Sequence, residues 1–210
     1  NIPGSPDLML ARAIVLELQN QSHEASRQLV QIQSRWPEWP APYVIHGVVL
    51  GSQHQAAEAK QMLETAIALG TRDPAAYYHL TLSIRDLTPN DHDSAYKTIM
   101  RGLRLDPADP YMQALAGRIA LDMKDFPAAL SHLQEAIHLY PEMADAHWLL
   151  ANLYRVTGQD EKQKSELAEV SRLNKLFPPG TQTPPAMQDL LFSVRKAGAG
   201  GQHPPTALKP

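Results

Sequence analysis

Apolar residues recur along this chain at steps of three and four, with polar residues between them. The clearest stretch, residues 110–141, predicts two short helices joined by a turn at residues 123–125. In the second of these helices Ala129, Leu133 and Ala136 follow one another by four and then three residues. Such steps place side chains on a single helical face, so this face is expected to pack against a neighbour.

Two residues in this stretch show how its helices meet and end. Gly117 stands inside the first predicted helix, where glycine costs about 1 kcal/mol relative to alanine. A close contact between the backbones of neighbouring helices would offset that cost. Pro141 ends the second helix, because proline has no N–H and clashes with the preceding turn.

The same pattern recurs through most of the chain. Similar stretches begin at Pro6, Pro40, Pro74, Pro110 and Ala144, which are 34, 34, 36 and 34 residues apart. Three positions can be aligned between the repeats. The first is a small residue in the first helix, the second is an alanine in the second helix, and the third is a bulky residue four positions after that alanine. They read Ala13, Gly47, Thr81, Gly117 and Ala151; Ala25, Ala59, Ala95, Ala129 and, as a departure, Gln163; and Leu29, Leu63, Ile99, Leu133 and Leu167.

This combination of small, alanine, bulky and terminal proline positions resembles the tetratricopeptide repeat, a helix–turn–helix unit of about 34 residues. The resemblance implies an all-α, right-handed α-solenoid of about five such units with a C-terminal extension. Each unit buries its apolar face only by stacking on its neighbours. The expected segments are a lead-in at 1–5, the repeat array at 6–176, a Pro-rich linker at 177–185, a short helix at 186–196 and a flexible tail at 197–210.

The predicted short helix at 186–196 needs cover for its apolar face. Met187, Leu190, Leu191 and Val194 share that face. We expect the segment to cap the last repeat. The alternative, which the sequence leaves open, is that it lies in the groove of its own or a neighbouring molecule.

Four features of individual units have a structural interpretation. Trp36 and Trp39 lie in a Pro-rich turn and are expected to pack onto the adjacent helix ends, although tryptophan is also common in binding hot spots. His46 replaces an apolar residue and is expected to be a hydrogen-bonded core residue. Residues 91–93, Asp-His-Asp, are expected to start a helix rather than bind a metal. The two extra residues of the third unit are placed in the turn at 87–91.

Composition and charge narrow the classes of partner. The net charge is −3, the pI is about 6.3, and Lys and Arg are not clustered as in a nucleic-acid-binding domain. No apolar run approaches the roughly 20 residues of a membrane span. Cysteine is absent. The chain begins at Asn1, so we expect it to be a processed or excised piece, and its compartment stays unassigned.

No motif for catalysis or cofactor binding is found in the sequence. It lacks a phosphate-binding Gly-rich loop, a His-Glu-x-x-His metal motif and a Gly-x-Ser-x-Gly nucleophile motif. His132 and Glu135 lie one helical turn apart, as many solvated pairs do. We therefore expect no catalytic residue, no cofactor and no metal site, and predict that the chain is not an enzyme.

The predicted function is a non-catalytic scaffold that binds a peptide or protein segment in its concave groove. One alternative is a self-assembly module that forms a homo-oligomer. Another is the recruiting domain of a larger enzyme. Nucleic acid and membrane insertion are not expected.

The resemblance also implies where the ligand binds. In tetratricopeptide repeats the first helix of each unit lines the concave surface, and the fifth and ninth positions of the unit face the ligand. In this chain those positions are Leu10 and Ile14; Val44 and Val48; Tyr78 and Leu82; Ala114 and Arg118; and Trp148 and Asn152. One helical turn further on lie Glu17, Gly51, Arg85, Leu121 and Arg155. The predicted peptide-binding residues are Val44, Val48, Tyr78, Leu82, Arg85, Tyr111, Arg118, Trp148, Asn152 and Arg155.

This set predicts apolar anchors at one end of the ligand and an acidic group at the other, held by arginine in a two-pronged contact. Alternatively, the arginines only pair with Asp86, Asp122 and Asp145 on the same surface. The lysine and asparagine set by which chaperone-binding repeats clamp a terminal carboxylate is not matched here. A chaperone-tail ligand is therefore not expected.

Overall fold

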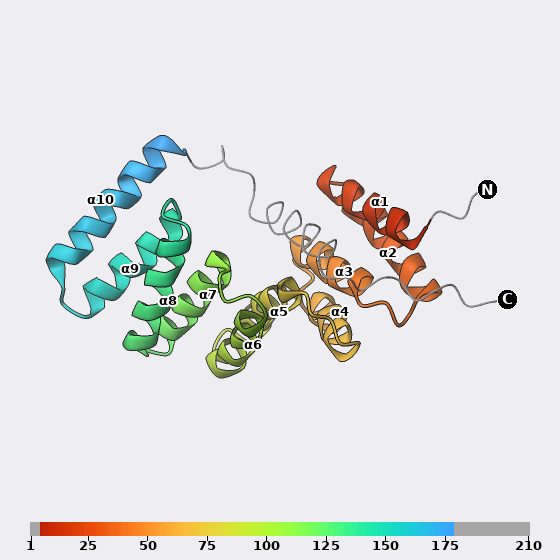
Figure 1. Ribbon diagram of the computed structural model, residues 1–210, viewed down its shortest axis with the longest axis horizontal. Coiled ribbons are helices and arrows are strands. Elements are labelled where there is room, and N and C mark those ends of the chain that lie inside the picture. Colours follow the sequence, from red (N-terminus) through yellow and green to blue (C-terminus); the bar gives the residue numbers. More distant parts are fainter. Residues whose placement is uncertain (1–4, 179–210) are drawn as a thin grey trace. The chain divides into compact units, whose positions relative to one another are not determined.

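The structure is a computed structural model that describes residues 5–178, and in this range the chain forms ten α-helices and no strand. Each helix is followed by a short turn and the next helix (Figure 1). The helices fall into two compact units, residues 5–88 and residues 89–178, which are described separately. The expected linker, short helix and tail after residue 178 lie outside the described residues.

Unit 1 holds the first five helices, which pack in sequence as helical hairpins. Helices α1, α2, α3 and α4 each contact the next helix along the chain, and α3 also contacts α1 and α5. The helices are α1 (Pro6–Leu18), α2 (Ser22–Arg35), α3 (Ala41–Ser52), α4 (Ala56–Ala68) and α5 (Pro74–Leu87).

Unit 2 holds the remaining five helices in the same kind of arrangement. Each contacts the next, and α7 also contacts α9. The helices are α6 (His92–Leu105), α7 (Pro110–Asp122), α8 (Phe126–Leu139), α9 (Ala144–Val156) and α10 (Asp160–Leu176). None of the helices within residues 5–178 is both long and apolar enough to span a membrane.

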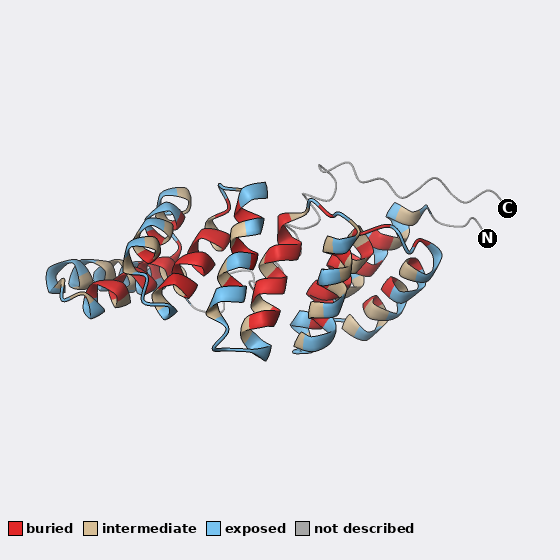
Figure 2. Cartoon of the chain, turned by 90° about the horizontal axis from the view of Figure 1, so that it is seen from below, coloured by how far each residue is buried: buried red, intermediate tan, exposed pale blue. Residues whose placement is uncertain are grey.

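Buried residues form stripes along the helices, with exposed residues on the other side (Figure 2). The two helix-interior glycines explain how a hairpin closes. A Cβ atom at Gly47 would lie 2.5 Å from Leu63 Cγ, and one at Gly117 would lie 2.7 Å from Leu133 Cγ. The fully buried leucine of the second helix therefore occupies the space that a side chain would need, as the sequence pattern indicates.

The expectations for the two tryptophans and for His46 are confirmed. Trp36 and Trp39 are buried in a cluster with Leu29, Ile32 and other residues of α1 to α3. His46 is buried, and its Nδ1 lies 3.2–3.3 Å from the side-chain amide of Gln33. Helix α5 ends at Leu87 and α6 begins at His92, so one of the two extra residues lies in this four-residue turn and the other extends the end of α5.

Residues 91–93 form a helix start, as expected. Asp91 is the N-cap of α6, and its carboxylate accepts a hydrogen bond from the Ser94 N–H at 3.1 Å. The described residues contain no group of three His, Asp or Glu side chains that could hold a metal ion.

At three junctions between repeats, the side chain of the fourth residue of one repeat lies within hydrogen-bond distance of a proline carbonyl at the end of the preceding repeat. The Tyr43 hydroxyl donates to the Pro37 carbonyl at 3.2 Å, and Gln113 Nε2 donates to the Pro107 carbonyl at 2.9 Å. His147 Nε2 lies 3.0 Å from the Pro141 carbonyl. Each donor is the fourth residue of its repeat and lies six residues after the proline.

The last helix departs from the expected register. The repeat pattern predicts Leu167 at the bulky buried position, but Leu167 is exposed, and Leu173 is the buried residue of α10. Helix α10 packs on α9 through the face that carries Glu166, Val170 and Leu173. Leu167 lies beside that face, and the structure describes no later helix that covers it.

Candidate ligand-binding surfaces

Five of the predicted ligand-binding residues lie in unit 1, and we call them the unit 1 surface: Val44 and Val48 on α3, and Tyr78, Leu82 and Arg85 on α5. Val48, Tyr78 and Leu82 line one cavity of about 220 Å³. The two valines are buried and the three α5 residues are half-buried. The structure therefore brings three of the five together around one apolar hollow.

The cavity also contains residues that the repeat pattern did not single out. His79 lines it and is buried, and its ring meets the Tyr78 ring edge-on, with 5.2 Å between ring centroids. Burial lowers the pKa of His79 to about 4, so the imidazole is neutral at pH 7. Its Nε2 atom is buried and has no hydrogen-bond partner within the described residues.

A second polar feature lies next to the unit 1 surface. Glu17 of α1 accepts a hydrogen bond from the Ser52 hydroxyl of α3, with 2.7 Å between the oxygens. Ser52 also lines the 220 Å³ cavity. The second carboxylate oxygen of Glu17 is buried and finds no donor among residues 5–178. Neither Glu17 nor His79 is among the predicted peptide-binding residues, although Glu17 occupies a groove-facing position.

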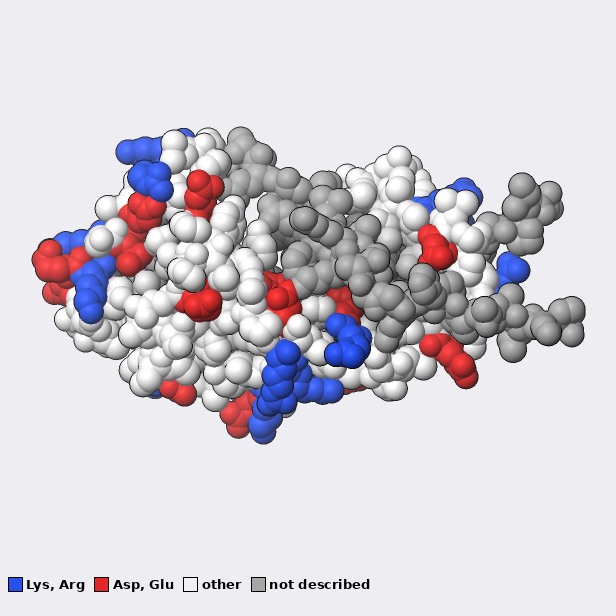
Figure 3. All heavy atoms as spheres, in the orientation of Figure 1, with Lys and Arg blue, Asp and Glu red and all other residues white. Residues whose placement is uncertain are grey.

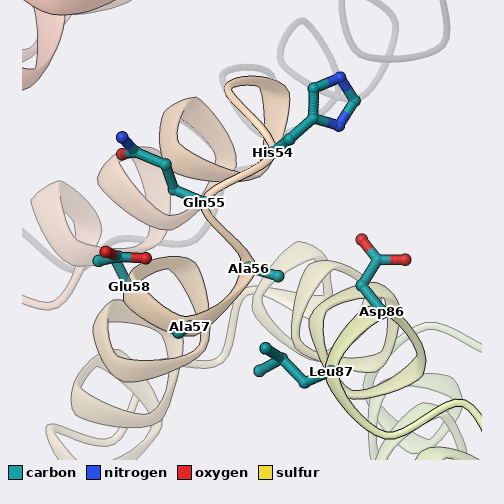
Figure 4. Close-up of a pocket in the computed structure, with 7 residues that line it drawn as sticks. All are labelled: His54, Gln55, Ala56, Ala57, Glu58, Asp86 and Leu87. Atoms are coloured by element: carbon teal, nitrogen blue, oxygen red, sulfur yellow. The ribbon is translucent and has the colours of Figure 1, made fainter.

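A wider hollow of about 730 Å³ lies where the turn before α4 meets the end of α5. Figure 4 shows His54, Gln55 and Glu58 on one side of it and Asp86 and Leu87 on the other. These five residues are exposed, and the hollow shares Asp86 with the lining of the smaller cavity. It does not form an enclosed site.

The other five predicted residues lie in unit 2, and we call them the unit 2 surface: Tyr111 and Arg118 on α7, and Trp148, Asn152 and Arg155 on α9. Trp148 is 48% exposed, which is unusual for so large an aromatic side chain. Arg155 donates two hydrogen bonds to Asn152 Oδ1, at 2.6 and 3.2 Å. The hydrogen bonds found for Arg155 therefore go to an amide rather than to an aspartate.

Tyr111 and Arg118 differ in their surroundings. The Tyr111 ring lies 6.3 Å from the Tyr140 ring in a tilted arrangement and packs on a cluster that contains Met143 and Ala146. Arg118 is half-buried. On the face shown in Figure 3, Lys and Arg side chains are interspersed with Asp and Glu.

Unit 2 also contains two polar chains that sequence reasoning missed. In the first, His132 Nδ1 lies 2.7 Å from Gln113 Oε1, and His132 Nε2 lies 3.0 Å from the Tyr96 hydroxyl. Because an amide oxygen only accepts, Nδ1 carries the proton and Tyr96 donates to Nε2. Burial lowers the pKa of His132, with Asp125 opposing the shift. His132 is therefore not the solvated partner of Glu135 that its spacing suggested.

In the second chain, His147 Nδ1 lies 2.6 Å from Glu166 Oε2, while Nε2 faces the Pro141 carbonyl. A histidine beside a carboxylate resembles a general acid–base pair. Here both ring nitrogens are occupied by acceptors of the fold, so neither nitrogen is available to a substrate. The sequence does carry a signal for two of these residues, because Gln113 and His147 both occupy the fourth position of a repeat.

Comparison with known families and structures agrees with this fold. A family model described as tetratricopeptide repeat matches residues 114–165, from within α7 to within α10. Among curated proteins, no sequence matches the chain.

Several solved structures have a similar fold. MamA from Desulfovibrio magneticus RS-1, residues 41 to the end, has a TM-score of 0.72 and 16% identity, covering 85% of this chain and 99% of that chain. Another MamA crystal structure has a TM-score of 0.69 and 14% identity, covering 77% and 93%. YrrB, described as a TPR protein with an unusual peptide-binding site, has a TM-score of 0.67 and 17% identity, covering 90% of each chain.

Proposed function

Because the chain is a tetratricopeptide repeat protein, we propose that it is a non-catalytic scaffold that binds a peptide or protein segment along the first helices of its repeats. Proteins built from these repeats are generally interaction modules. The observation that carries the proposal is the cavity in which Val48, Tyr78 and Leu82 meet. Apolar and aromatic side chains around a hollow supply the desolvated contact area on which peptide recognition depends.

The unit 2 surface supplies the second kind of contact. Exposed Trp148 offers a flat apolar contact area, and the guanidinium of Arg155 is held by Asn152 on the same helix. A guanidinium positioned in this way binds a carboxylate with two parallel hydrogen bonds. We therefore propose that the ligand combines apolar anchors, which bind to the unit 1 surface, with an acidic group, which binds to the unit 2 surface. The likeness to YrrB supports a peptide as the class of ligand.

The test begins with affinity capture from the source organism on the full chain, followed by mass spectrometry. With the recovered partner, Arg118→Ala combined with Arg155→Ala should weaken binding at least tenfold, about 1.4 kcal/mol, because the acidic group loses its cations. The matched control removes two cations of α10, Lys164→Ala with Arg172→Ala, whose carboxylate partners are both on α10. Equal loss of affinity in both variants would place the acidic contact elsewhere.

Self-assembly is the alternative that needs its own measurement. Light scattering on the isolated chain over a wide concentration range separates the two functions. A scaffold for other proteins keeps one mass, whereas a self-assembly module forms defined oligomers without a ligand.

A further inference from the structure

Three residues that depart from the repeat pattern line the cavity of about 220 Å³ in unit 1. They are Gly51 of α3 and His79 and Ser83 of α5. The equivalent positions of the other repeats carry longer side chains in place of Gly51 and apolar side chains in place of His79 and Ser83. They are Glu17, Arg85, Leu121 and Arg155; Ala11, Ile45, Leu115 and Leu149; and Val15, Val49, Ile119 and Leu153. Three separate departures therefore meet at one hollow.

The first departure, Gly51, leaves the cavity open. A Cβ atom at this position would have no other atom within 4 Å. Val48 of α3 and Leu82 of α5 supply apolar walls. An apolar cavity of roughly 150 Å³ in a protein core is large enough to bind benzene. The hollow in unit 1 therefore has room for one six-membered ring with a small substituent.

The second departure, His79, gives the cavity a polar group that lacks a partner. The side chain is 9% exposed, and its buried Nε2 atom makes no hydrogen bond within residues 5–178. The counterpart in the second repeat, Ile45, belongs to the apolar core. A buried nitrogen without a partner lowers stability, so a histidine at an otherwise apolar position is expected to bind something. A fitting ligand therefore brings a hydrogen-bonding group to the imidazole.

The polar groups of the cavity favour a neutral ligand over an anion. Burial lowers the pKa of His79 to about 4, so the imidazole carries no charge at pH 7. Asp86 adds a carboxylate, and no Lys or Arg is among the described residues that line the cavity. An anion would therefore be desolvated without a counter-charge. Ser83 Oγ donates to the His79 carbonyl at 3.0 Å and keeps lone pairs that accept.

We propose that the cavity binds the ring of an unmodified tyrosine of the partner segment, with the phenol hydroxyl hydrogen-bonded to His79. A hydroxyl both donates and accepts, so it pairs with either tautomer of the neutral imidazole. The ring packs against Val48 and Leu82, and a phosphate on it would be repelled by Asp86. The inference rests on the proposed function and deepens it, because it names the residue that the partner inserts into the unit 1 surface.

Two small probes test the site in the full chain without a partner. p-Cresol reproduces the tyrosine side chain, and toluene lacks only its hydroxyl. NMR shifts of the Val48 and Leu82 methyl groups should show p-cresol binding at least tenfold more tightly than toluene. In His79→Leu, p-cresol should bind no more tightly than toluene, because the hydroxyl loses its partner. The control His23→Leu changes an exposed histidine of α2 and should keep the native preference.

A second variant tests the space rather than the hydrogen bond. Gly51→Leu introduces the side chain that the fourth repeat carries as Leu121 and fills the cavity. It should weaken p-cresol binding at least tenfold, and circular dichroism should show the native helix content. Three results would overturn the proposal: no shift of Val48 and Leu82, equal affinity for p-cresol and toluene, or a preference that survives His79→Leu.

A partner recovered by affinity capture extends the test to the tyrosine itself. Replacing the tyrosine of its bound segment by phenylalanine should weaken binding to the native chain at least tenfold. The same replacement should have little effect on binding to His79→Leu, because the two changes remove one hydrogen bond. A bound segment without tyrosine would overturn this inference and leave the scaffold function standing. If p-cresol binds as expected but no protein is captured, the scaffold function fails while the phenol site stands.

Discussion

Gly117 and Leu133 form a close contact between the two helices of the fourth repeat. A Cβ atom at position 117 would lie 2.7 Å from Leu133 Cγ, 2.8 Å from Cδ2 and 3.3 Å from the Leu133 backbone nitrogen. The backbone atom cannot move away without displacing α8. The contact therefore restricts the side chain at residue 117 more strictly than helix propensity does.

We expect Gly117→Ala to lower the free energy of unfolding by about 1–3 kcal/mol, because overpacking outweighs the gain in helix propensity. Gly117→Leu should cost at least as much. Gly51→Ala is the matched control, since nothing lies within 4 Å of its Cβ position, and it should stabilise the chain by about 0.5–1 kcal/mol. Urea unfolding measures both. A Gly117→Ala variant as stable as the native chain would contradict the packing argument.

His79 is the other residue whose environment makes a definite prediction. The equivalent residues of the second, fourth and fifth repeats are Ile45, Leu115 and Leu149, all buried. Replacing His79 by leucine removes a buried ring nitrogen that has no partner among the described residues. We expect His79→Leu to raise the free energy of unfolding by about 1–2 kcal/mol at pH 7.

Thermal unfolding of His79→Leu beside His23→Leu, an exposed site in α2 of the same unit, checks this expectation. The exposed substitution should have little effect on stability. A destabilised His79→Leu variant would mean that the imidazole makes a bond that stabilises the fold.

At the scale of the element, the second helix of each repeat begins at the same position but with different chemistry. Asp91 and Asp125 cap α6 and α8 with side-chain hydrogen bonds of 3.1 Å. Gln21, Gln55 and Gln159 hold the equivalent position in the other repeats and make no side-chain cap. Three of the five second helices therefore begin without a side chain that satisfies their first N–H groups.

We expect Gln55→Asp to stabilise the chain by about 0.5–1 kcal/mol, because aspartate at this position caps the helix and favours the positive end of its dipole. The reverse change Asp125→Gln should cost a similar amount. Denaturant midpoints of the two variants provide the comparison. Shifts of the same sign would show that the cap position is not equivalent between repeats.

The helices themselves could be predicted from the sequence, because their signals are local. A proline at the first position of a helix and a small residue facing a bulky one are both read from neighbouring residues, and the pattern returns every 34 residues or so. The contact between Gly117 and Leu133 follows from these signals. The choice of Leu173 over Leu167 in α10 depends on how that helix rolls against α9. The local sequence pattern does not predict this rotation of α10 about its own axis.

The candidate site divides in the same way. The cavity of Val48, Tyr78 and Leu82 was predictable from repeat positions. Sequence reasoning did not predict the burial of Val44 or the bond between Arg155 and Asn152. Nor did it predict that His79 Nε2 is buried without a hydrogen-bond partner among residues 5–178. Each depends on which side chains meet in space, and a periodic pattern identifies the facing positions without identifying the partners.

At the scale of the whole molecule, buried histidines should make the chain sensitive to acid. Burial lowers the pKa of His46, His79 and His132. In the unfolded chain histidine titrates near pH 6.5. Below that pH these histidines bind protons in the unfolded chain but stay neutral in the folded chain. The free energy of unfolding therefore decreases as the pH falls.

The contribution of His79 to the free energy of unfolding begins to decrease near pH 6.5, where the unfolded chain binds the proton. The decrease ends below about pH 4, where the folded chain binds it too. We expect it to amount to about 3 kcal/mol over this range, at about 1.4 kcal/mol for each unit of pKa difference. Urea unfolding at a series of pH values measures it, and His79→Leu should flatten the profile. Asp109, whose pKa is raised by burial, acts in the opposite direction at the acid end. A stability independent of pH between about 7 and about 4.5 would contradict the prediction.

The joint in which a proline carbonyl accepts a hydrogen bond from the fourth residue of the next repeat has an evolutionary consequence. A phenol, an amide and an imidazole each make this bond in one chain. Any side chain of suitable length with a hydrogen-bond donor can make this bond. The donor residue at one junction can therefore be substituted independently of the donors at the other junctions. A duplicated copy of residues 110–143 would carry its own Gln113 donor, and Pro141 would already present the acceptor. The array is therefore able to lengthen by whole repeats without inventing a new junction.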